Sequence, residues 1–227
     1  MQGELRFRTW GGKREGAGRK PAGARAGVSH AARPNHQGRH PAHVTLRAGK
    51  RLPSLRSQAV FIAVRRSIGA AHSARFRVLH FSVQRDHIHL LVEANDKTSL
   101  SRGMAGLTIR IARAVNCVLG RRGRVWGDRY HARPLRTPRE VRHGLVYVLA
   151  NWKKHRPEAR GFDPCSSAWW FRGWTRPPLS EISGWEEREG PVEPATQWLS
   201  CIGWKRYGLI APEERPRDVP AARRSSR

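Results

Sequence analysis

Residues 86–92 of the chain read Asp86-His87-Ile88-His89-Leu90-Leu91-Val92. The run is short, apolar and rich in branched side chains, which is typical of a buried or half-buried β-strand. Side chains two residues apart on a strand point to the same face, so His87 and His89 present two imidazoles side by side. Such a pair is half of a divalent-metal site. The alternative is a chance pair in a chain with 11 histidines, and the downstream sequence decides between them.

The charge of the chain is strongly positive. There are 44 Lys and Arg residues against 17 Asp and Glu residues, which gives a net charge of +27 and a pI near 11.7. Most of the cations are Arg, whose planar fork suits phosphate oxygens and stacking on bases. Biased composition explains Arg in place of Lys, but not the excess of cations over anions. The balance predicts a nucleic-acid partner, and no apolar stretch is long enough to span a membrane.

The cysteines indicate neither zinc binding nor disulfides. Cys117, Cys165 and Cys201 are odd in number and far apart, without a Cys-x-x-Cys pair. No apolar segment follows the basic N-terminus, so a secretory signal is not expected. We therefore expect a protein of the reducing cytoplasm.

Composition divides the chain into four regions. We expect a flexible basic arm over 1–41, a folded domain over 42–160, a Trp-rich irregular extension over 161–211 and a disordered tail over 212–227. The arm is rich in Gly, Arg and Pro and cannot bury a core, so it either contacts a phosphate backbone or only solubilises the chain. The cations of the arm expected to contact DNA are Lys13, Arg14, Arg19 and Lys20.

The folded region alternates strand and helix patterns. Strands are expected over 43–47, 75–83, 87–93 and 129–136, and helices from residue 54 to 72, 99 to 119 and 137 to 155. This β-α-β-β-α-β-α order predicts an α+β ferredoxin-like split β-α-β sandwich. Two helices cover one face of its antiparallel sheet, and the C-terminal helix is free to cover the other.

Three caps are expected at the helix starts. Ser54 precedes the first periodic run, and Thr98 or Ser99 precedes the second. The third helix has the strongest signal, because Thr137 is followed by Pro138 and, at the third position, by Glu140.

The third helix carries a second set of polar residues. Tyr147, Asn151 and His155 are spaced four residues apart and therefore share a face. If this helix docks on the open sheet face, Tyr147 and Asn151 lie over His87 and His89. Two imidazoles and an amide oxygen would hold a metal with open positions for a phosphodiester oxygen, and the phenol would be the nucleophile. Ring burial is the simpler interpretation of the tyrosine alone.

The combination resembles the single-tyrosine HUH transposases, and among them the REP-associated tyrosine transposases. The likeness rests on the His87–His89 strand, on Trp126-Gly127-Asp128-Arg129-Tyr130 and on Tyr147-Val148-Leu149-Ala150-Asn151. It covers about residues 43–160 and implies that 42–160 is a catalytic domain. It implies Mg²⁺ or Mn²⁺ at His87, His89 and Asn151, where ligand softness alone also admits Zn²⁺.

The resemblance also implies a reaction and a substrate. Tyr147 would form a 5′-phosphotyrosine on single-stranded, hairpin-forming repeat DNA, releasing a 3′-OH, in a monomer or homodimer of a bacterial mobile element. Many relatives have Pro after this Asn, whereas Trp152 stands here, so the helix is expected to run on slightly further.

Other residues compete for roles at this site. Tyr130 is the rival nucleophile, and His131 and His155 are possible additional site residues. A basic cluster flanks the expected site and either contacts DNA or is solvated; it consists of Arg121, Arg122, Arg124 and Arg129.

Two further functions compete with the transposase. A domesticated, non-catalytic nucleic-acid-binding protein would not need His87, His89, Tyr147 and Asn151 together. An RNA-binding ferredoxin-like module displays aromatic residues on its sheet, but Phe76 and Phe81 are expected to alternate to opposite faces.

Overall fold

The computed structural model describes residues 35–154, 156, 158–176 and 190–216. The strands are β1 (Ala42–Arg47), β2 (Phe76–Val83), β3 (His87–Ala94) and β4 (His131–Pro134). The α-helices are α1 (Gln58–Gly69), α2 (Lys97–Val118), α3 (Pro138–Leu149) and α4 (Trp198–Cys201). Three short 3₁₀ helices are η1 (Asn151–Lys154), η2 (Ala168–Trp170) and η3 (Gly203–Tyr207).

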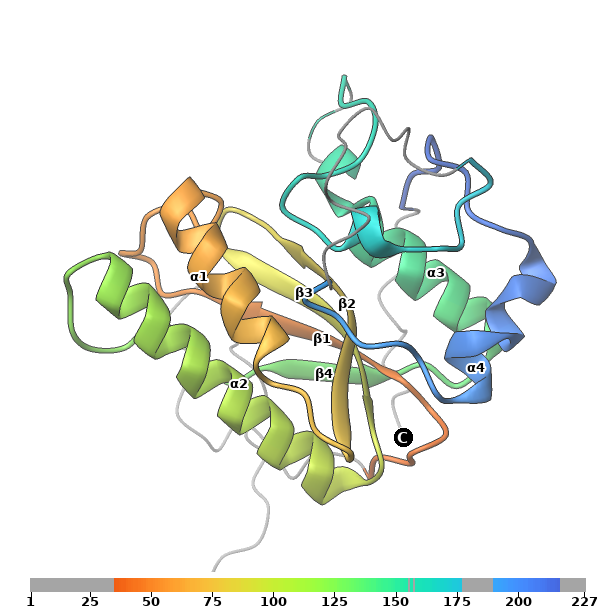
Figure 1. The fold of residues 1–227 in the computed structure, drawn as a ribbon, viewed down its shortest axis with the longest axis horizontal. Coiled ribbons are helices and arrows are strands. Elements are labelled where there is room, and N and C mark those ends of the chain that lie inside the picture. The colour runs from red at the N-terminus through yellow and green to blue at the C-terminus, as the bar shows by residue number, and fades with distance from the viewer. Residues whose placement is uncertain (1–34, 155, 157, 177–189, 217–227) are drawn as a thin grey trace, which may run out of the picture. The chain divides into compact units, whose positions relative to one another are not determined.

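The strands form one antiparallel sheet in the order β2-β3-β1-β4. Together with the element order, this confirms the ferredoxin-like prediction. Helices α1 and α2 cover one face, and α3 lies on the other with the C-terminal segments (Figure 1). The hairpin expected at 84–86 joins β2 to β3, and the Gln84 amide donates to the His87 carbonyl at 2.8 Å.

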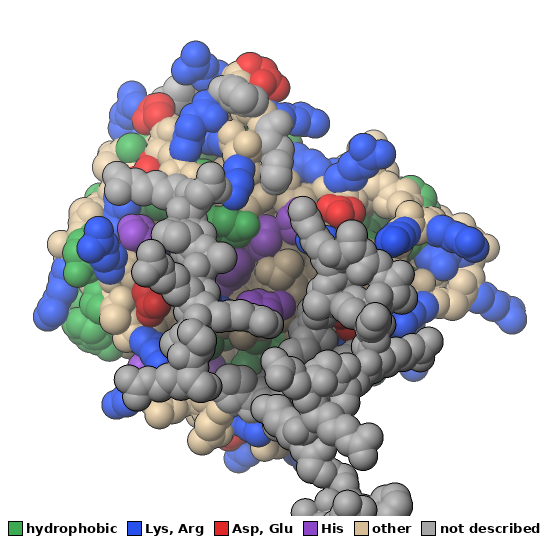
Figure 2. Space-filling view, turned by 180° about the vertical axis from the view of Figure 1, so that it is seen from behind, with side chains coloured by type: hydrophobic (Ala, Val, Ile, Leu, Met, Phe, Trp, Pro, Cys, Tyr) green, Lys and Arg blue, Asp and Glu red, His purple; other side chains and the backbone are tan. Residues whose placement is uncertain are grey.

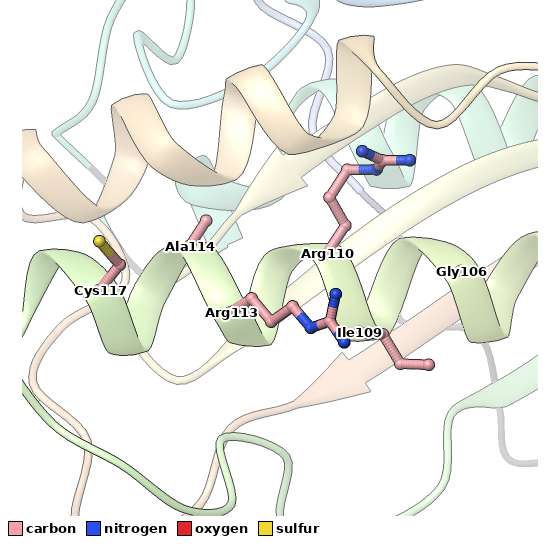
Figure 3. A pocket seen from close by; sticks show the side chains of 6 residues that line it. All are labelled: Gly106, Ile109, Arg110, Arg113, Ala114 and Cys117. Carbon is pink, nitrogen blue, oxygen red and sulfur yellow. The ribbon is translucent and has the colours of Figure 1, made fainter.

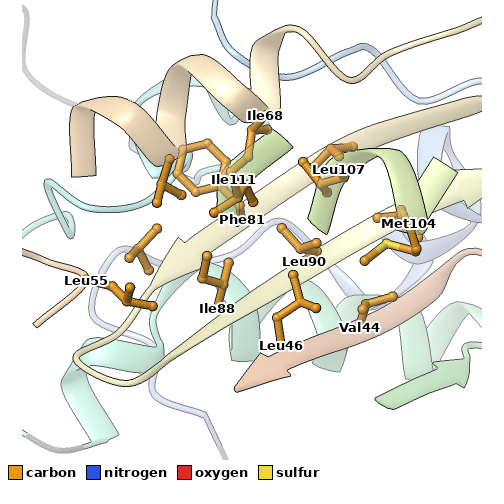
Figure 4. Packing of buried hydrophobic residues seen from close by; sticks show 14 of the residues in the cluster. Val44, Leu46, Leu55, Ile68, Phe81, Ile88, Leu90, Met104, Leu107 and Ile111 are labelled. Carbon is orange, nitrogen blue, oxygen red and sulfur yellow. The ribbon is translucent and has the colours of Figure 1, made fainter. Parts of the chain in front are cut away.

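The main core lies between the sheet and helices α1 and α2 (Figure 4). Ile88, Leu90 and Val92 of β3 are fully buried in it. Because strand side chains alternate, the residues between them face α3 instead. Leu91 accordingly belongs to a second core, formed with α3 and the C-terminal segments. The β3 strand is therefore apolar on both faces except where the histidines and Glu93 stand.

A β-bulge in β2 overturns one expectation from the sequence. The register shifts between Val78 and His80, because a bulge places two residues of one strand opposite one of its partner. Phe76 and Phe81 consequently both lie in the core under α1 and α2. The expected alternation to opposite faces is wrong, and neither ring is on the open face that an RNA-binding sheet would use.

The helix starts differ from two of the three expected caps. Helix α1 begins at Gln58 after Ser57, so Ser54 does not cap it. Helix α2 begins at Lys97, and Asp96 caps it by accepting from the Ser99 amide at 2.7 Å. An aspartate is as good an N-cap as serine or threonine, which the sequence analysis overlooked.

Helix α3 has the start that was predicted and a different end. Thr137 and Glu140 form a complete capping box with Pro138 in the first turn. The helix stops at Leu149, and the chain continues as η1. The expectation that it runs to about residue 155 is therefore wrong, since a tighter 3₁₀ turn takes over at Asn151.

The C-terminal segments are fastened to the sheet by buried carboxylates. Glu93 of β3 is 3% exposed and accepts from the Thr196 and Gln197 amides. Asp163 is fully buried and forms a bidentate ion pair with Arg56 at 2.7 and 2.9 Å. Such groups are costly to bury unless paired, so these contacts fix where the extension lies.

His80 is a half-buried histidine on the α3 face of β2. It lies 3.2 Å from the Ser167 hydroxyl, and its ring packs edge-on against Phe171. Burial lowers the pKa of His80 to about 3. The folded protein therefore holds this ring neutral at pH values where an unfolded histidine is protonated.

Among the described helices, none combines the length and apolar character that a membrane crossing requires.

Two glycines of α2 predict opposite effects of the same substitution. A Cβ on Gly103 would lie 2.2 Å from the Phe76 ring, whereas one on Gly106 would meet nothing within 4 Å. We expect Gly103→Ala to lower the free energy of unfolding by ~1–3 kcal/mol through overpacking. Gly106→Ala should raise it by ~0.5–1 kcal/mol through helix propensity. Urea unfolding of both variants checks this, and equal effects would contradict the close approach to Phe76.

The low pKa of His80 predicts that the folded protein loses stability in acid. Its folded-state pKa lies below the ordinary value of 6.5, so the unfolded chain binds more protons between pH 6.5 and 3. The stabilisation is complete above pH 6.5 and is lost as the pH falls through this window, at about 1.4 kcal/mol per pH unit. Urea unfolding at pH 7, 6 and 5 should show a shallower dependence for His80→Gln. Parallel dependences in the two proteins would refute the assignment.

Candidate functional site

His87 and His89 stand on the face of β3 that is not covered by α1 and α2. Their ring centroids are 4.7 Å apart, with the rings nearly perpendicular at 80°. His89 is 4% exposed, while the side chain of His87 is 17% exposed. The two imidazoles therefore share one face of the sheet, as the two-residue period of a strand predicts. His89 lies inside the molecule and His87 at its surface.

Asp86 orients the outer imidazole. Its Oδ1 lies 2.7 Å from His87 Nδ1, and this hydrogen bond is the main cause that lowers the pKa of the Asp86 carboxyl. With Nδ1–H donating to the carboxylate, Nε2 of His87 keeps its lone pair. A carboxylate behind the imidazole is the usual support of a metal-binding histidine.

Two β1 residues hold the inner imidazole. His43 Nε2 and Thr45 Oγ1 each lie 3.2 Å from His89 Nδ1, because β1 pairs with β3 so that Thr45 is opposite His89. These contacts occupy Nδ1 and fix the ring. The sequence predicted a strand over residues 43–47 but no site role for His43 or Thr45. Only the strand register, which the sequence leaves open, places them here.

Burial also acts on the pKa of His43. Desolvation, with smaller contributions from His131 and Arg133, lowers it to about 4. His43 is therefore neutral near pH 7, and one of its ring nitrogens can accept a hydrogen bond while the other donates.

Tyr147 packs onto this histidine group from α3. Its ring centroid is 5.0 Å from that of His89 and 5.3 Å from that of His43, with edge-on geometry in both cases. Lys154 Nζ, on η1, is 5.9 Å from the Tyr147 ring centroid. The structure therefore brings Tyr147 against His89 and His43, with α3 docked on the open face of the sheet.

Asn151 is buried one turn beyond Tyr147. It is 1% exposed, and neither its Oδ1 nor its Nδ2 has a hydrogen-bond partner among the described residues. A buried amide without partners is costly, which suits a group whose partner is a bound ligand. The early end of α3 puts this residue on η1 instead of on the helix where it was expected.

These donors fit a divalent metal with open positions. The part of the chain that the structure describes contains no group of three His, Cys, Asp or Glu residues able to hold a metal. Two imidazoles with Asn151 as an amide donor would leave such an ion several free positions. That His87, His89 and Asn151 hold a metal together stays a prediction.

Tyr130, the rival nucleophile, lies elsewhere. It packs against the core under α1 and α2, because the next residue, His131, pairs with Thr45 and so faces the histidine side. Tyr130 and Arg129 border a cavity of about 260 Å³ that includes Lys97 and Ser101 of α2. A second cavity runs along the outer surface of α2 beside Ile109 and Arg113 (Figure 3). Neither contains a histidine of the site.

The basic loop after α2 returns to the histidine end of the sheet. The Gly127 amide donates to the Arg47 carbonyl, and Arg47 is paired with His87. Arg122 is exposed, while the guanidinium of Arg121 donates to the Arg124 carbonyl and that of Arg124 to the Trp126 carbonyl. Histidines gather on one face of the molecule with Lys and Arg around them (Figure 2).

Several predicted residues cannot be placed. The arm cations and His155 lie outside the described residues. The cations concerned are Lys13, Arg14, Arg19 and Lys20.

Comparison with protein families gives the same assignment as the motifs. Residues 38–142 match the family described as Transposase IS200 like. By sequence, this segment is similar to the IS200-like transposases. The IS200-like segment contains the whole sheet with His87 and His89, and it ends inside α3, before Tyr147 and Asn151.

Solved structures similar to this chain include that of a REP-associated tyrosine transposase bound to a REP hairpin. Its sequence identity to this chain is 20% and the TM-score is 0.45, over 57% of this chain and 75% of that one. No curated protein matches the chain.

Proposed function

We propose that this IS200-like chain is a metal-assisted enzyme that nicks and rejoins single-stranded, hairpin-forming DNA. The observation that carries the proposal is the packing of the Tyr147 ring against His89, at 5.0 Å between centroids, beside His87. Nucleic-acid binding alone needs no such grouping. Tyr147 lies against histidines of its own chain, so we assign the reaction to one subunit.

Tyr147 is the nucleophile of this reaction. Its phenolic oxygen attacks the phosphorus of a phosphodiester and forms a 5′-phosphotyrosine, while the bond to the 3′-oxygen breaks. The phenol loses its proton, and the departing oxygen takes one up to become a 3′-OH. The ester keeps the energy of the broken bond, so a 3′-OH can attack it and rejoin the strands.

His87, His89 and Asn151 would hold the metal, Mg²⁺ or Mn²⁺. When bound, such an ion polarises a phosphate oxygen and orients the phosphodiester. Asp86 keeps the Nε2 lone pair of His87 available, and His43 and Thr45 fix the ring of His89. The unpartnered amide of Asn151 gives the third donor.

The charge of the chain supplies the affinity for DNA. The net charge of +27 favours a polyanion, and the loop with Arg121, Arg122 and Arg124 leads back to the strand end at Arg47. We assign these cations and Arg129 to backbone contacts, which position DNA without reading its sequence.

Adduct formation tests the nucleophile. Full-length protein with Mn²⁺ should become covalently attached to the 5′ side of a labelled single-stranded hairpin oligonucleotide, as a shifted band on denaturing gels. Tyr147→Phe should abolish the band because it removes the phenol that packs against His89. Tyr130→Phe is the matched control and should keep it.

An adduct in Tyr147→Phe would reject the nucleophile. Tight hairpin binding by the unaltered protein without any adduct would favour the domesticated, non-catalytic alternative.

Metal binding is tested without catalysis. Manganese binding, followed by electron paramagnetic resonance, should weaken at least about tenfold in His87→Ala and Asn151→Ala. Tyr147→Phe should bind Mn²⁺ as the unaltered protein does, since its phenol is not a proposed ligand. Unchanged binding in His87→Ala would show that the ion lies elsewhere.

A further inference from the structure

Arg142 ties α3 to the C-terminal segment 208–215. Its guanidinium makes a bidentate ion pair with Glu214, at 2.7 and 2.9 Å. It also donates to the carbonyls of Gly208 at 2.9 Å and Leu209 at 3.0 Å. Gly208 has a φ of +80°, a conformation that favours glycine and turns the chain at this contact. All four hydrogen bonds therefore go to one short segment.

The same segment also holds the chain beyond Asn151. Lys153 is 4% exposed, and its ammonium donates to the Pro212 carbonyl. Arg215 donates to the Lys153 carbonyl at 2.9 Å. The neighbouring Lys154 is exposed beside Tyr147.

The segment itself is anchored in the second core. Ile210 is fully buried there with residues of α3. Its amide donates to the Gly173 carbonyl at 3.0 Å, and its carbonyl accepts from the Thr175 amide at 2.9 Å. The C-terminal segment runs beside α3 (Figure 1). It therefore joins α3 before Tyr147 and η1 after Asn151 to the same support.

From these contacts we propose that residues 208–215 are a brace that positions Tyr147 and Asn151, with Arg142 and Glu214 as its positioning residues. The inference rests on the proposed function. A nucleophile displaced by about 1 Å can lose a hundredfold in rate, and helix packing alone permits small shifts. A planar guanidinium that is held at four points fixes one orientation.

The test separates positioning from binding. Single-turnover adduct formation is measured at saturating hairpin DNA with Mn²⁺, well below the lowest unfolding midpoint of all variants. Arg142→Ala and Glu214→Ala should each slow the rate constant at least about tenfold. Their DNA dissociation constants should stay within about threefold, since one charge among many is changed. Arg142→Lys should remain slow, because an ammonium cannot form the bidentate pair.

Paired variants distinguish a brace from general loss of structure. The double variant Arg142→Ala/Glu214→Ala should be no slower than the slower single one, because both remove one contact. The exchanged pair Arg142→Glu/Glu214→Arg should recover part of the rate. Arg176→Ala is the matched control: it removes an ion pair with Glu213 of the same segment whose side chains are 72% and 64% exposed. Because such exposed pairs add little stability, it should leave the rate unchanged.

Hydrogen exchange supplies a readout that is independent of catalysis. Peptides covering residues 143–151 should exchange faster in Glu214→Ala than in the unaltered protein or Arg176→Ala. If neither the unaltered protein nor any variant forms the adduct, the proposed function fails. The brace is then tested by hydrogen exchange over residues 143–151 alone. An unaltered rate in both single variants, a rate loss matched by weaker DNA binding, or unchanged exchange over 143–151 overturns the brace.

Discussion

The pairing of β1 with β3 is the constraint on which the candidate site depends. Thr45 lies opposite His89 and Arg47 opposite His87, so the histidines share a face with His43 and Thr45. A slip of one residue would turn every side chain of the strand to the other face. It would bury both imidazoles under α1 and α2 and expose Ile88 and Leu90. The apolar core thus enforces the register, and the register in turn assembles the histidine group.

Helix α3 completes the candidate site by packing on the sheet face that carries the histidines. The α3 face of the sheet is apolar at Leu79 and Leu91 and polar at His87 and His89. Helix α3 matches this division, since Val141 and Leu145 lie in the second core while Tyr147 meets the imidazoles. The hydrophobic contacts dock the helix, and polar contacts from Arg142 and Lys153 restrict where it rests.

The sequence was sufficient for the fold, and it named the residues on which the proposed site rests. Period-two and helical patterns gave the strand and helix order, and Thr137 with Glu140 marked the start of α3. The helical spacing also predicted that Tyr147 lies over His87 and His89 if this helix docks on the open face of the sheet. It missed the cap at Asp96 and the bulge in β2, because a bulge leaves no mark in an apolar strand. It missed His43 and Thr45 for a different reason: contacts across strands depend on register, which is set by the packed core as a whole.

The buried Glu93 extends the consequences of the fold beyond the site. It stands on the same strand and face as the histidines, and its carboxylate has the 196–197 backbone as its partner. A fragment ending near residue 160 would remove the donors that pair with Glu93 and would uncover the apolar side chains of Leu79 and Leu91 beside it. Such a fragment would aggregate through this exposed apolar surface, even though it carries every proposed metal ligand and Tyr147.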